Sequence, residues 1–217
     1  MSAPPPYFPP AGPLRIVFAD EALIVLDKPS GLLSVPGRGP DRADCLVSRI
    51  RQEFPDALAV HRLDMSTSGL IVLARGEDMH RRLSRLFRER QVDKRYVAVV
   101  AGLVEADAGE IDLPLIVDWP NRPRQMVDHT IGKPSLTRFR VLERLPASGT
   151  TRVELEPWTG RSHQLRVHMA SLGHPILGDE LYGDESSAPR LLLHAQSLGF
   201  VHPLSGEALA FRTEAEF

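Results

Sequence analysis

The sequence contains a single cysteine, Cys45, among its 217 residues. An internal disulfide therefore cannot form, and a metal site built from several cysteines is excluded. The longest apolar run, 96–104, has nine residues, whereas a membrane-spanning helix needs about 20. No lysine or arginine precedes Arg15, so the N-terminus resembles neither a secretory signal nor an arginine-rich transit peptide. These absences predict a cytoplasmic protein that does not enter membranes and is stabilised by packing.

Neither sign of charge dominates the composition. Lysine and arginine number 26 and the acidic residues 28, which gives a formal net charge of -2. The basic residues gather in two stretches: 75–95 has eight basic and four acidic residues, and 119–140 has five basic residues and one acidic residue, Asp128. This distribution favours a bounded site for a polyanion over a protein that coats nucleic acid by its total charge.

Short apolar segments bounded by turn residues predict most of the secondary structure as strands. Segment 69–74 is the clearest of these, because it is continuously apolar, short and contains Ile71 and Val72. The expected strands are 14–18, 22–27, 69–74, 96–101 and 152–156, followed by a terminal hairpin of 191–195 and 198–201.

Three segments have the apolar spacing of helices. In the first, Asp44 is the expected N-cap and the apolar stripe runs to Phe54. The second begins at Asp78, buries the stripe of Met79 and Leu83, and turns three arginines to the opposite face. The third spans 161–172, with Ser162 as the expected cap and Gly173 as the stop. The outward arginines of the second helix are Arg81, Arg85 and Arg88.

Strands outnumber helices and often follow one another directly, which predicts an α+β fold with a mixed, largely antiparallel sheet flanked by helices. No repeat and no long linker divides the pattern. We therefore expect a short proline-rich arm over 1–13 and one catalytic domain over 14–217.

Asp64 lies in a polar segment immediately before the strand at 69–74. Asp followed by Ser, Thr and Gly often only caps a turn. A carboxylate between a basic residue and the rigid end of a buried strand can also be an acid or a nucleophile. Local chemistry leaves both interpretations open.

The order of the polar motifs resembles that of the RluA-type pseudouridine synthases, enzymes that isomerise uridine within RNA. The resemblance extends from about residue 14 to the C-terminus and includes five motifs in the family's order. They are Lys28-Pro29-Ser30-Gly31-Leu32, His61-Arg62-Leu63-Asp64 with Thr67-Ser68-Gly69, Lys94-Arg95-Tyr96, the run from Thr159 to His168, and Arg190-Leu191-Leu192-Leu193-His194-Ala195.

The resemblance implies an RNA pseudouridine synthase that needs no cofactor, because the reaction moves the uracil from an N1 to a C5 linkage on ribose C1′ without net redox change. It implies Asp64 as the catalytic carboxylate, which either adds to the nucleotide or removes a ribose proton. Arg166 is the implied partner that keeps this carboxylate ionised, although helical periodicity alone would place Arg166 on an outward face. Tyr96 is the implied residue that stacks on the target base and assists proton removal from C5.

Further residues are implied in RNA binding. The target uridine must be swung out of its stack, and Arg62 is the implied wedge, although a surface ion pair is an equally good interpretation of that arginine. The other implied substrate-binding residues are His61, Arg161, His163 and Leu193. The helical spacing, not the resemblance, adds Arg81, Arg85 and Arg88 as candidates for phosphate contacts, although such a stripe is more often only a solvated helix surface.

The segment 118–123 resembles the dual-specificity members of the family, which act on 23S rRNA and on the tRNA anticodon stem-loop. We therefore expect structured RNA stem-loops, not DNA, as the partner of a monomeric enzyme. Only 13 residues precede the first expected strand, so the S4-type RNA-binding domain of many relatives is not expected.

Two rival functions remain. An RNA-binding or ribosome-assembly protein could use the same fold without catalysis, and a nucleosidase could use Asp64 for hydrolysis, although such enzymes usually have two carboxylates. A metal site is not expected, because His163 and His168 are five residues apart instead of the four of helical ligand pairs.

Overall fold

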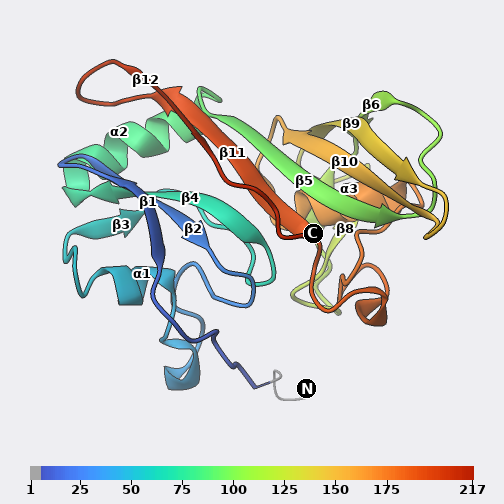
Figure 1. The fold of residues 1–217 in the computed structure, drawn as a ribbon, viewed down its shortest axis with the longest axis horizontal. Helices are drawn as coiled ribbons and strands as arrows, with labels where there is room; N and C mark the ends of the chain where they lie inside the picture. The colour runs from blue at the N-terminus through green and yellow to red at the C-terminus, as the bar shows by residue number, and fades with distance from the viewer. Residues whose placement is uncertain (1–5) are drawn as a thin grey trace. The chain divides into compact units, whose positions relative to one another are not determined.

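The computed structural model describes residues 6–217, which form two compact units. The first unit runs to Val92 and includes 198–213, and the second contains 93–197 and 214–217. Figure 1 shows the elements of both. Within residues 6–217, no helix is long and apolar enough to cross a membrane. The expected single domain over 14–217 stays a prediction.

The first unit is built on an antiparallel sheet whose inner strands are almost fully buried. Strand β2 pairs with β1 on one side and with β4 on the other, and β3 also pairs with β4. The strands are β1 (Arg15–Ala19), β2 (Leu23–Lys28), β3 (Ala57–Ala59) and β4 (Ser68–Arg75), joined by β12 (Ala208–Arg212) and the second half of β11 (Leu193–Val201). The expected strand at 69–74 is confirmed.

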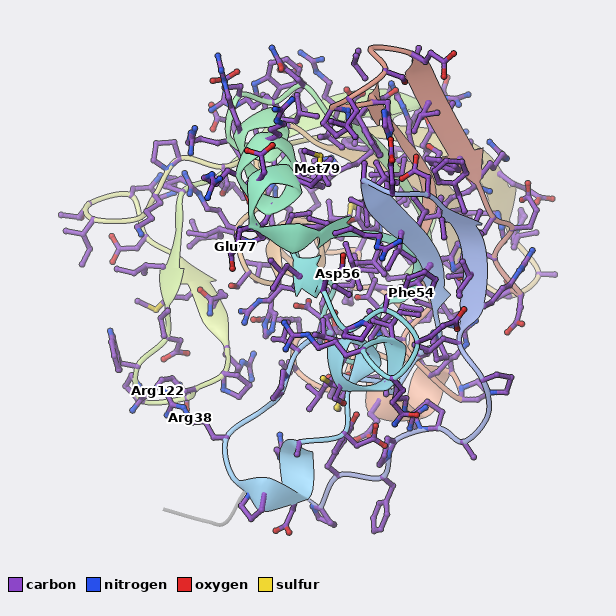
Figure 2. All side chains as sticks on the ribbon, turned by 90° about the vertical axis from the view of Figure 1, so that its left-hand side faces the viewer. Arg38, Phe54, Asp56, Glu77, Met79 and Arg122 are labelled. Carbon is purple, nitrogen blue, oxygen red and sulfur yellow. The ribbon has the colours of Figure 1, made fainter. Side chains whose placement is uncertain are left out.

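Two helices flank this sheet, α1 (Leu46–Ile50) and α2 (Gly76–Arg88), with a short 3-10 turn, η1 (Pro40–Arg42), before them. Met79 and Leu83 of α2 are buried in the core, as the apolar stripe predicted. Figure 2 labels Glu77 and Met79 in the first turn of α2, and Phe54 and Asp56 in the segment before β3.

Both predicted acidic caps in this unit were wrong. Cys45, not Asp44, caps α1, because its sulfur accepts from the Ser48 backbone N–H while the Ser48 hydroxyl accepts from the Cys45 N–H. Asp44 instead pairs with Arg49 at 2.7 Å. Helix α2 begins at Gly76, so Asp78 lies inside its first turn.

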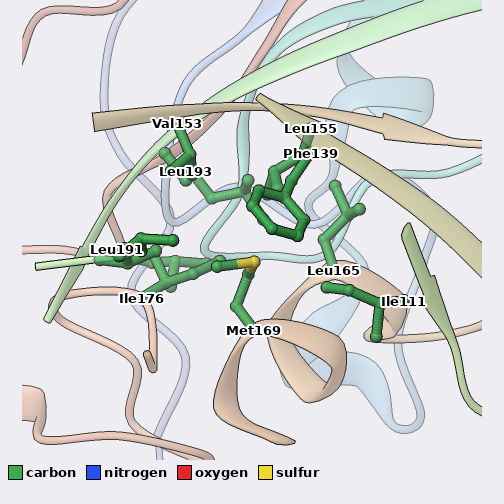
Figure 3. Packing of buried hydrophobic residues seen from close by; sticks show 12 residues of the cluster. Ile111, Phe139, Val153, Leu155, Leu165, Met169, Ile176, Leu191 and Leu193 are labelled. Atoms are coloured by element: carbon green, nitrogen blue, oxygen red, sulfur yellow. The ribbon is translucent and has the colours of Figure 1, made fainter. Parts of the chain in front are cut away.

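The second unit contains a second set of antiparallel strands, ordered β5-β10-β9-β6, and the first half of β11. These strands are β5 (Asp93–Ala101), β6 (Ala108–Asp112), β9 (Leu136–Leu145) and β10 (Thr150–Pro157). Helix α3 (Gln164–Ser171) packs on them, and its Met169 lies in a core with Ile176 and Leu193 (Figure 3). The α+β class with a largely antiparallel sheet is confirmed.

A separate two-stranded sheet is formed by β7 (Leu115–Val117) and β8 (Gln125–Val127), and a 3-10 turn, η2 (Glu185–Ser187), follows α3. We call residues 115–127 the β7–β8 hairpin. It was not expected from the sequence.

The third helix and the terminal hairpin differ from expectation. Helix α3 begins at Gln164, and its N-cap is His163 in the left-handed region (φ 53°), not Ser162. Gly173, with φ 84°, follows the helix end as expected. The hairpin of 191–195 with 198–201 was wrong: β11 continues through Gln196, because this buried amide donates to Glu214 at 2.9 Å. The strand that follows β11 in the chain and pairs with it is β12.

Candidate active site

Asp64 lies in the first unit, in the loop between β3 and β4, and its side chain is half-buried. The loop is fixed on both sides of this residue. The Ser34 hydroxyl donates to the Leu63 carbonyl at 2.7 Å, and the Leu63 N–H donates to the same hydroxyl at 3.1 Å. The Asp64 carbonyl accepts from the Thr67 N–H at 3.2 Å. The carboxylate therefore rises from a backbone with a defined conformation.

Lys28, the last residue of β2, holds a second loop against the Asp64 loop. Its ammonium is fully buried and donates to three backbone carbonyls, those of Pro29 (3.0 Å), Leu32 (2.7 Å) and Met65 (3.0 Å). The Gly31 N–H also donates to the Met65 carbonyl at 2.8 Å. A lysine has three donors, and here every acceptor is a carbonyl of the two loops.

Burial lowers the pKa of Lys28 from 10.5 to about 7, and the negative charge of Asp64 acts in the opposite direction. A buried ammonium is unfavourable unless it is hydrogen-bonded or paired. The three carbonyls and the nearby carboxylate supply this compensation. Lys28 thus fixes the backbone of the Asp64 loop by a hydrogen bond and also interacts electrostatically with the Asp64 carboxylate.

His61 and Arg62 precede Asp64 in very different surroundings. The His61 ring stacks on Phe87 of α2, with centroids 4.4 Å apart and planes inclined by 23°. Its Nε2 accepts from the Val72 N–H at 3.0 Å, so this nitrogen carries no proton and the imidazole is neutral. The Arg62 side chain is exposed. The structure therefore places His61 as a packed link between β4 and α2 and Arg62 at the surface.

The three arginines of α2 are exposed, as the helical spacing predicted. Arg81 pairs with Asp78 at 3.3 Å, and Arg85 pairs with Glu89 at 2.7 Å. Both are pairs between neighbouring turns of one helix at the surface, which contribute about 0.5 kcal/mol or less. Such pairs can exchange their acidic partner for a phosphate at little cost.

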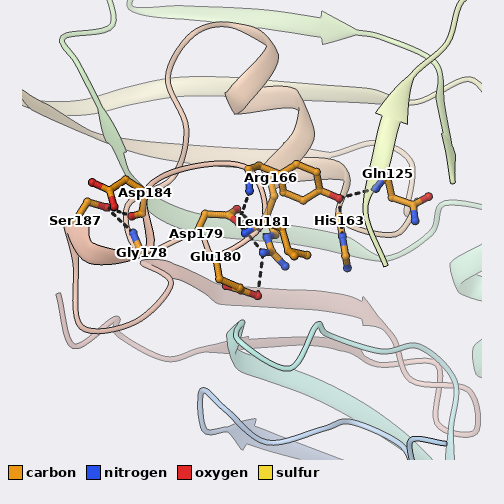
Figure 4. Close-up of polar contacts among 10 residues, drawn as sticks. Gln125, His163, Arg166, Gly178, Asp179, Glu180, Leu181, Asp184 and Ser187 are labelled. Carbon is orange, nitrogen blue, oxygen red and sulfur yellow. Dashed lines mark hydrogen bonds and ion pairs between the residues drawn. The ribbon is translucent and has the colours of Figure 1, made fainter. Parts of the chain in front are cut away.

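Arg166 lies in the second unit, on α3, and is almost completely buried. Its Nε and Nη2 donate to the two carboxylate oxygens of Asp179 at 2.8 and 2.6 Å, and Nη2 also lies 3.1 Å from Glu180 (Figure 4). The outward position that periodicity alone suggested was wrong. The buried charge is tolerated because Asp179, also fully buried, neutralises it.

The Asp179 carboxylate accepts four hydrogen bonds and is the centre of this arrangement. Besides Arg166, the N–H groups of Leu181 and Tyr182 donate to its Oδ1 at 2.9 and 3.0 Å. Burial tends to raise the pKa of the Asp179 carboxyl, but the Arg166 guanidinium and the two N–H groups together hold it below its usual value. Gly178 has φ +71°, and a Cβ there would clash with the Arg190 carbonyl, so only glycine leads into this loop.

His163 and Arg161 surround the start of α3. The Nδ1 of His163 lies 2.7 Å from the Tyr182 hydroxyl. The exposed Arg161 donates through Nε to the Pro134 carbonyl at 3.2 Å, and its N–H donates to the Gln164 side chain at 3.0 Å. These contacts fix the conformation of the segment before α3, in which His163 has a left-handed backbone conformation.

The two remaining predicted residues lie on strands of the second unit. Tyr96 on β5 pairs with Leu155, is half-buried, and packs against the core around α3. Leu193 is 3% exposed and belongs to that core, so its side chain contributes to packing.

The structure thus gathers the predicted residues into two groups. His61, Arg62, Asp64 and the α2 arginines belong to the first unit, and Tyr96, Arg161, His163, Arg166 and Leu193 to the second. The expected pairing of Arg166 with Asp64 stays a prediction. The sequence did not predict the roles of Asp179 and Tyr182 or the burial of Lys28. For Asp179 the reason is that no periodic pattern relates an arginine in a helix to an aspartate 13 residues away. Within residues 6–217, no cluster of three or more His, Cys, Asp or Glu side chains suits a metal ion.

Comparison with known families gives one clear match. The family model described as RNA pseudouridylate synthase matches residues 22–171. The chain is 50% identical over 215 residues to "Dual-specificity RNA pseudouridine synthase RluA" of Haemophilus influenzae, covering 97% of this chain and 98% of that protein. It is 51% identical to the Escherichia coli K12 protein of the same name, with the same coverage.

Two solved structures have the same fold. "Human RNA Pseudouridylate Synthase Domain Containing 1" matches with a TM-score of 0.79 and 32% identity over 97% of this chain and 87% of that one. "Human RNA Pseudouridylate Synthase Domain Containing 4" matches with a TM-score of 0.75 and 26% identity over 93% and 88%.

Proposed function

We propose a function that proceeds from the family to which the chain belongs, the RNA pseudouridylate synthases. The enzyme converts specific uridines to pseudouridine in stem-loops of 23S rRNA and of tRNA, including the anticodon stem-loop. That the chain is an RNA pseudouridine synthase, an isomerase, follows from the family match. The observation that supports both RNA classes is the identity of about half of all residues, over 97% of the chain, with relatives named as dual-specificity enzymes. The proposal places the enzyme with these RNAs in the cytoplasm, as a monomer.

Asp64 is the proposed catalytic carboxylate. In the reaction, the bond from ribose C1′ to uracil N1 breaks, the base turns, and a bond from C1′ to C5 forms. C5 then loses its proton and N1 takes up a proton, so that the product is an isomer of the substrate. The carboxylate must be ionised either to add to the nucleotide or to remove a ribose proton. The support for Asp64 is its rigid loop, in which the Leu63 carbonyl accepts from Ser34 and the Met65 carbonyl accepts from Lys28, so that the backbone is fixed on both sides of the carboxylate.

Arg166 and Tyr96 are the proposed catalytic residues of the second unit. Arg166 has a fixed guanidinium, since Asp179 holds it at two points, and its proposed role is to keep the Asp64 carboxylate ionised. Tyr96 extends from β5 with its ring only half-buried, and its proposed roles are to stack on the target uracil and to assist the loss of the C5 proton. Both roles come from the positions of these residues in the family's motifs.

The remaining proposed residues bind the RNA. The target base must leave its stack, at a cost of a few kcal/mol, and the exposed Arg62 can fill the vacated place because a guanidinium plane stacks on bases. Arg81, Arg85, Arg88 and Arg161 are exposed cations suited to phosphates. His61, His163 and Leu193 act through packing and hydrogen bonds that position the residues beside them.

The experiment that tests the function uses RNA labelled with tritium at uracil C5. Isomerisation releases tritium and leaves the RNA chain and its base content intact. Hydrolysis would free uracil, and binding alone would do neither. Carbodiimide primer extension on total RNA from cells with and without the protein then maps the targets. Loss of pseudouridine in only one RNA class would refute dual specificity, and loss at no site would refute the proposal.

A further inference from the structure

The proline-rich chain before β1 is hydrogen-bonded to the rest of the first unit at two points, one of them on α1 (Figure 1). Tyr7 is half-buried, and its hydroxyl accepts from the Leu33 N–H at 3.0 Å. Three residues later, the Pro10 carbonyl accepts from Nη1 of Arg49, a residue of α1, at 2.9 Å. We call residues 7–10 the N-terminal brace.

The bond to Pro10 comes from an arginine whose orientation is fixed. Nε and Nη2 of Arg49 donate to the two carboxylate oxygens of Asp44, both at 2.7 Å, and this bond holds the pKa of the Asp44 carboxyl below its usual value. A guanidinium bound at two points presents its remaining N–H groups in fixed directions. Asp44, which does not cap α1, thus orients the arginine that binds the N-terminal brace.

The bond from Tyr7 reaches the segment that supports the Asp64 loop. Leu33 lies in segment 30–34, and its carbonyl accepts from the Leu46 N–H at 2.8 Å. Other residues of this segment donate to backbone carbonyls on both sides of Asp64. These bonds join Ser30 to Ser66 at 2.7 Å, Gly31 to Met65 at 2.8 Å and Ser34 to Leu63 at 2.7 Å.

The Tyr7 hydroxyl is therefore connected to Asp64 by a short path. Leu33 directly precedes Ser34 in the chain, and Leu63, to which Ser34 bonds through both its carbonyl and its N–H, directly precedes Asp64. A backbone N–H that is partly removed from water needs an acceptor. Loss of the Tyr7 hydroxyl takes this acceptor from Leu33, so the segment that carries Ser34 would be less firmly held.

We propose that Tyr7 is a positioning residue for the reaction: through segment 30–34, the N-terminal brace sets the position of the loop that carries the Asp64 carboxylate. The inference rests on the proposed function, since it takes Asp64 as the catalytic carboxylate. Tyr7 acts through the backbone of two loops, so it contributes to the rate of the chemical step and not to RNA binding.

The first test measures single-turnover tritium release, with enzyme in excess over an anticodon stem-loop. Tyr7→Phe keeps the ring and loses the hydroxyl, so the rate constant should fall about tenfold, less than the roughly hundredfold that a misplacement of about 1 Å can cost. Because folded enzyme stays in excess, partial unfolding does not lower this rate constant. The affinity for the stem-loop, measured by filter binding, should stay within about twofold, since no phosphate contact is lost.

Thr151→Val is the matched control for a lost hydroxyl. The Thr151 hydroxyl also accepts from a backbone N–H, that of Val104 at 3.0 Å, but in the second unit. This variant should unfold at lower urea concentration, because a buried N–H loses its acceptor, and should keep the rate constant of the wild type. Phe8→Leu is the control within the N-terminal brace: Phe8 is 82% exposed, so both its stability and its rate should be unchanged.

The second test is a double-mutant cycle on the rate constant. Ser34→Ala removes the hydroxyl that holds Leu63, so it should slow release at least as much as Tyr7→Phe. If Tyr7 acts through segment 30–34, the double variant should be little slower than Ser34→Ala alone. Additive losses would overturn this route.

Hydrogen exchange followed by mass spectrometry gives a third readout that needs no activity. The N–H groups of Leu63 and Thr67 donate to the Ser34 hydroxyl and the Asp64 carbonyl. In Tyr7→Phe, the peptide that contains both should exchange several-fold faster than in the wild type, because the loop opens more often. In Thr151→Val it should exchange at the wild-type rate.

An unchanged rate constant in Tyr7→Phe, or an equal fall in Thr151→Val, would overturn the positioning role. Unchanged exchange of the Asp64 loop in Tyr7→Phe would overturn it as well. Absence of tritium release by the wild-type enzyme would contradict the proposed function instead, and the exchange data would then still decide whether the N-terminal brace positions the loop.

Discussion

Arg166 and Asp179 form a two-point ion pair in which both side chains are removed from solvent, with nitrogen to oxygen distances of 2.8 and 2.6 Å and side-chain exposures of 2% and 0%. Breaking a buried pair by removing one partner leaves the other charge uncompensated. The pair therefore couples the stability of the second unit to the position of a proposed catalytic arginine.

Asp179→Asn should lower the free energy of unfolding by about 3–5 kcal/mol, because the buried Arg166 would keep only the more exposed Glu180 as its counter-charge. Urea unfolding measures this loss. Glu180→Gln is the control: Glu180 is the more exposed partner, at 34%, so its cost should be below about 1 kcal/mol. Similar small losses in both variants would contradict the assignment of Asp179 as the main partner.

The same carboxylate predicts an acid dependence. The pKa of Asp179 is lower in the folded state than its usual value, so its stabilising effect is fully present above that usual value and is lost as the pH falls toward the folded pKa. Acid unfolding followed by circular dichroism should therefore be steeper for the wild type than for Asp179→Asn. Parallel curves would show that this group does not contribute.

Lys28 predicts the same direction in the neutral to alkaline range. Its pKa is about 7 in the folded protein and near 10.5 when unfolded, so unfolding takes up a proton between these values. Raising the pH through this window should therefore stabilise the protein, by at most about 1.4 kcal/mol per pH unit. Comparison of urea unfolding at pH 6.5 and 8.5 for the wild type and Lys28→Met should show a smaller increase in the variant. An equal increase would mean that another group titrates.

Asp64→Asn should abolish tritium release while leaving RNA affinity within a few-fold of the wild type, because the carboxylate acts on the reacting bonds and contributes little to phosphate contacts. Single-turnover assays and filter binding measure the two effects separately. Asp56→Asn is a suitable control, since Asp56 pairs with Arg75 at 3.2 Å at the surface. Comparable turnover by Asp64→Asn would refute its catalytic role.

Replacement of Arg81, Arg85 and Arg88 by alanine should flatten the dependence of log affinity on log salt by about 2 to 3 units, at about 0.7–0.9 per phosphate contact. The charge-matched control removes three arginines of β9 that pair with acids on neighbouring segments. These are Arg138, Arg140 and Arg144. An unchanged slope in the α2 variant would mean that this face of the helix is only solvated.

The distribution of apolar residues was sufficient to predict two elements, one with a single buried face and one that is buried throughout. The apolar stripe of α2 is buried and its arginines are exposed, and the continuously apolar β4 is an inner strand. The motif order was sufficient for the family, since the family model matches 22–171. Each of these properties depends on residues that are near neighbours or occur in a fixed order along the chain.

Only the tertiary structure decided the rest, because it depends on partners distant in the sequence. Helix α3 is buried from Gln164 to Met169, and its polar side chains are satisfied by segments such as the Asp179 loop, so it has no polar face to detect. Gln196 could continue a buried strand only because Glu214 accepts from it. Lys28 could be buried only because three carbonyls converge on it. A buried polar group needs a hydrogen-bonding partner, and the fold, not the local sequence, brings that partner to it.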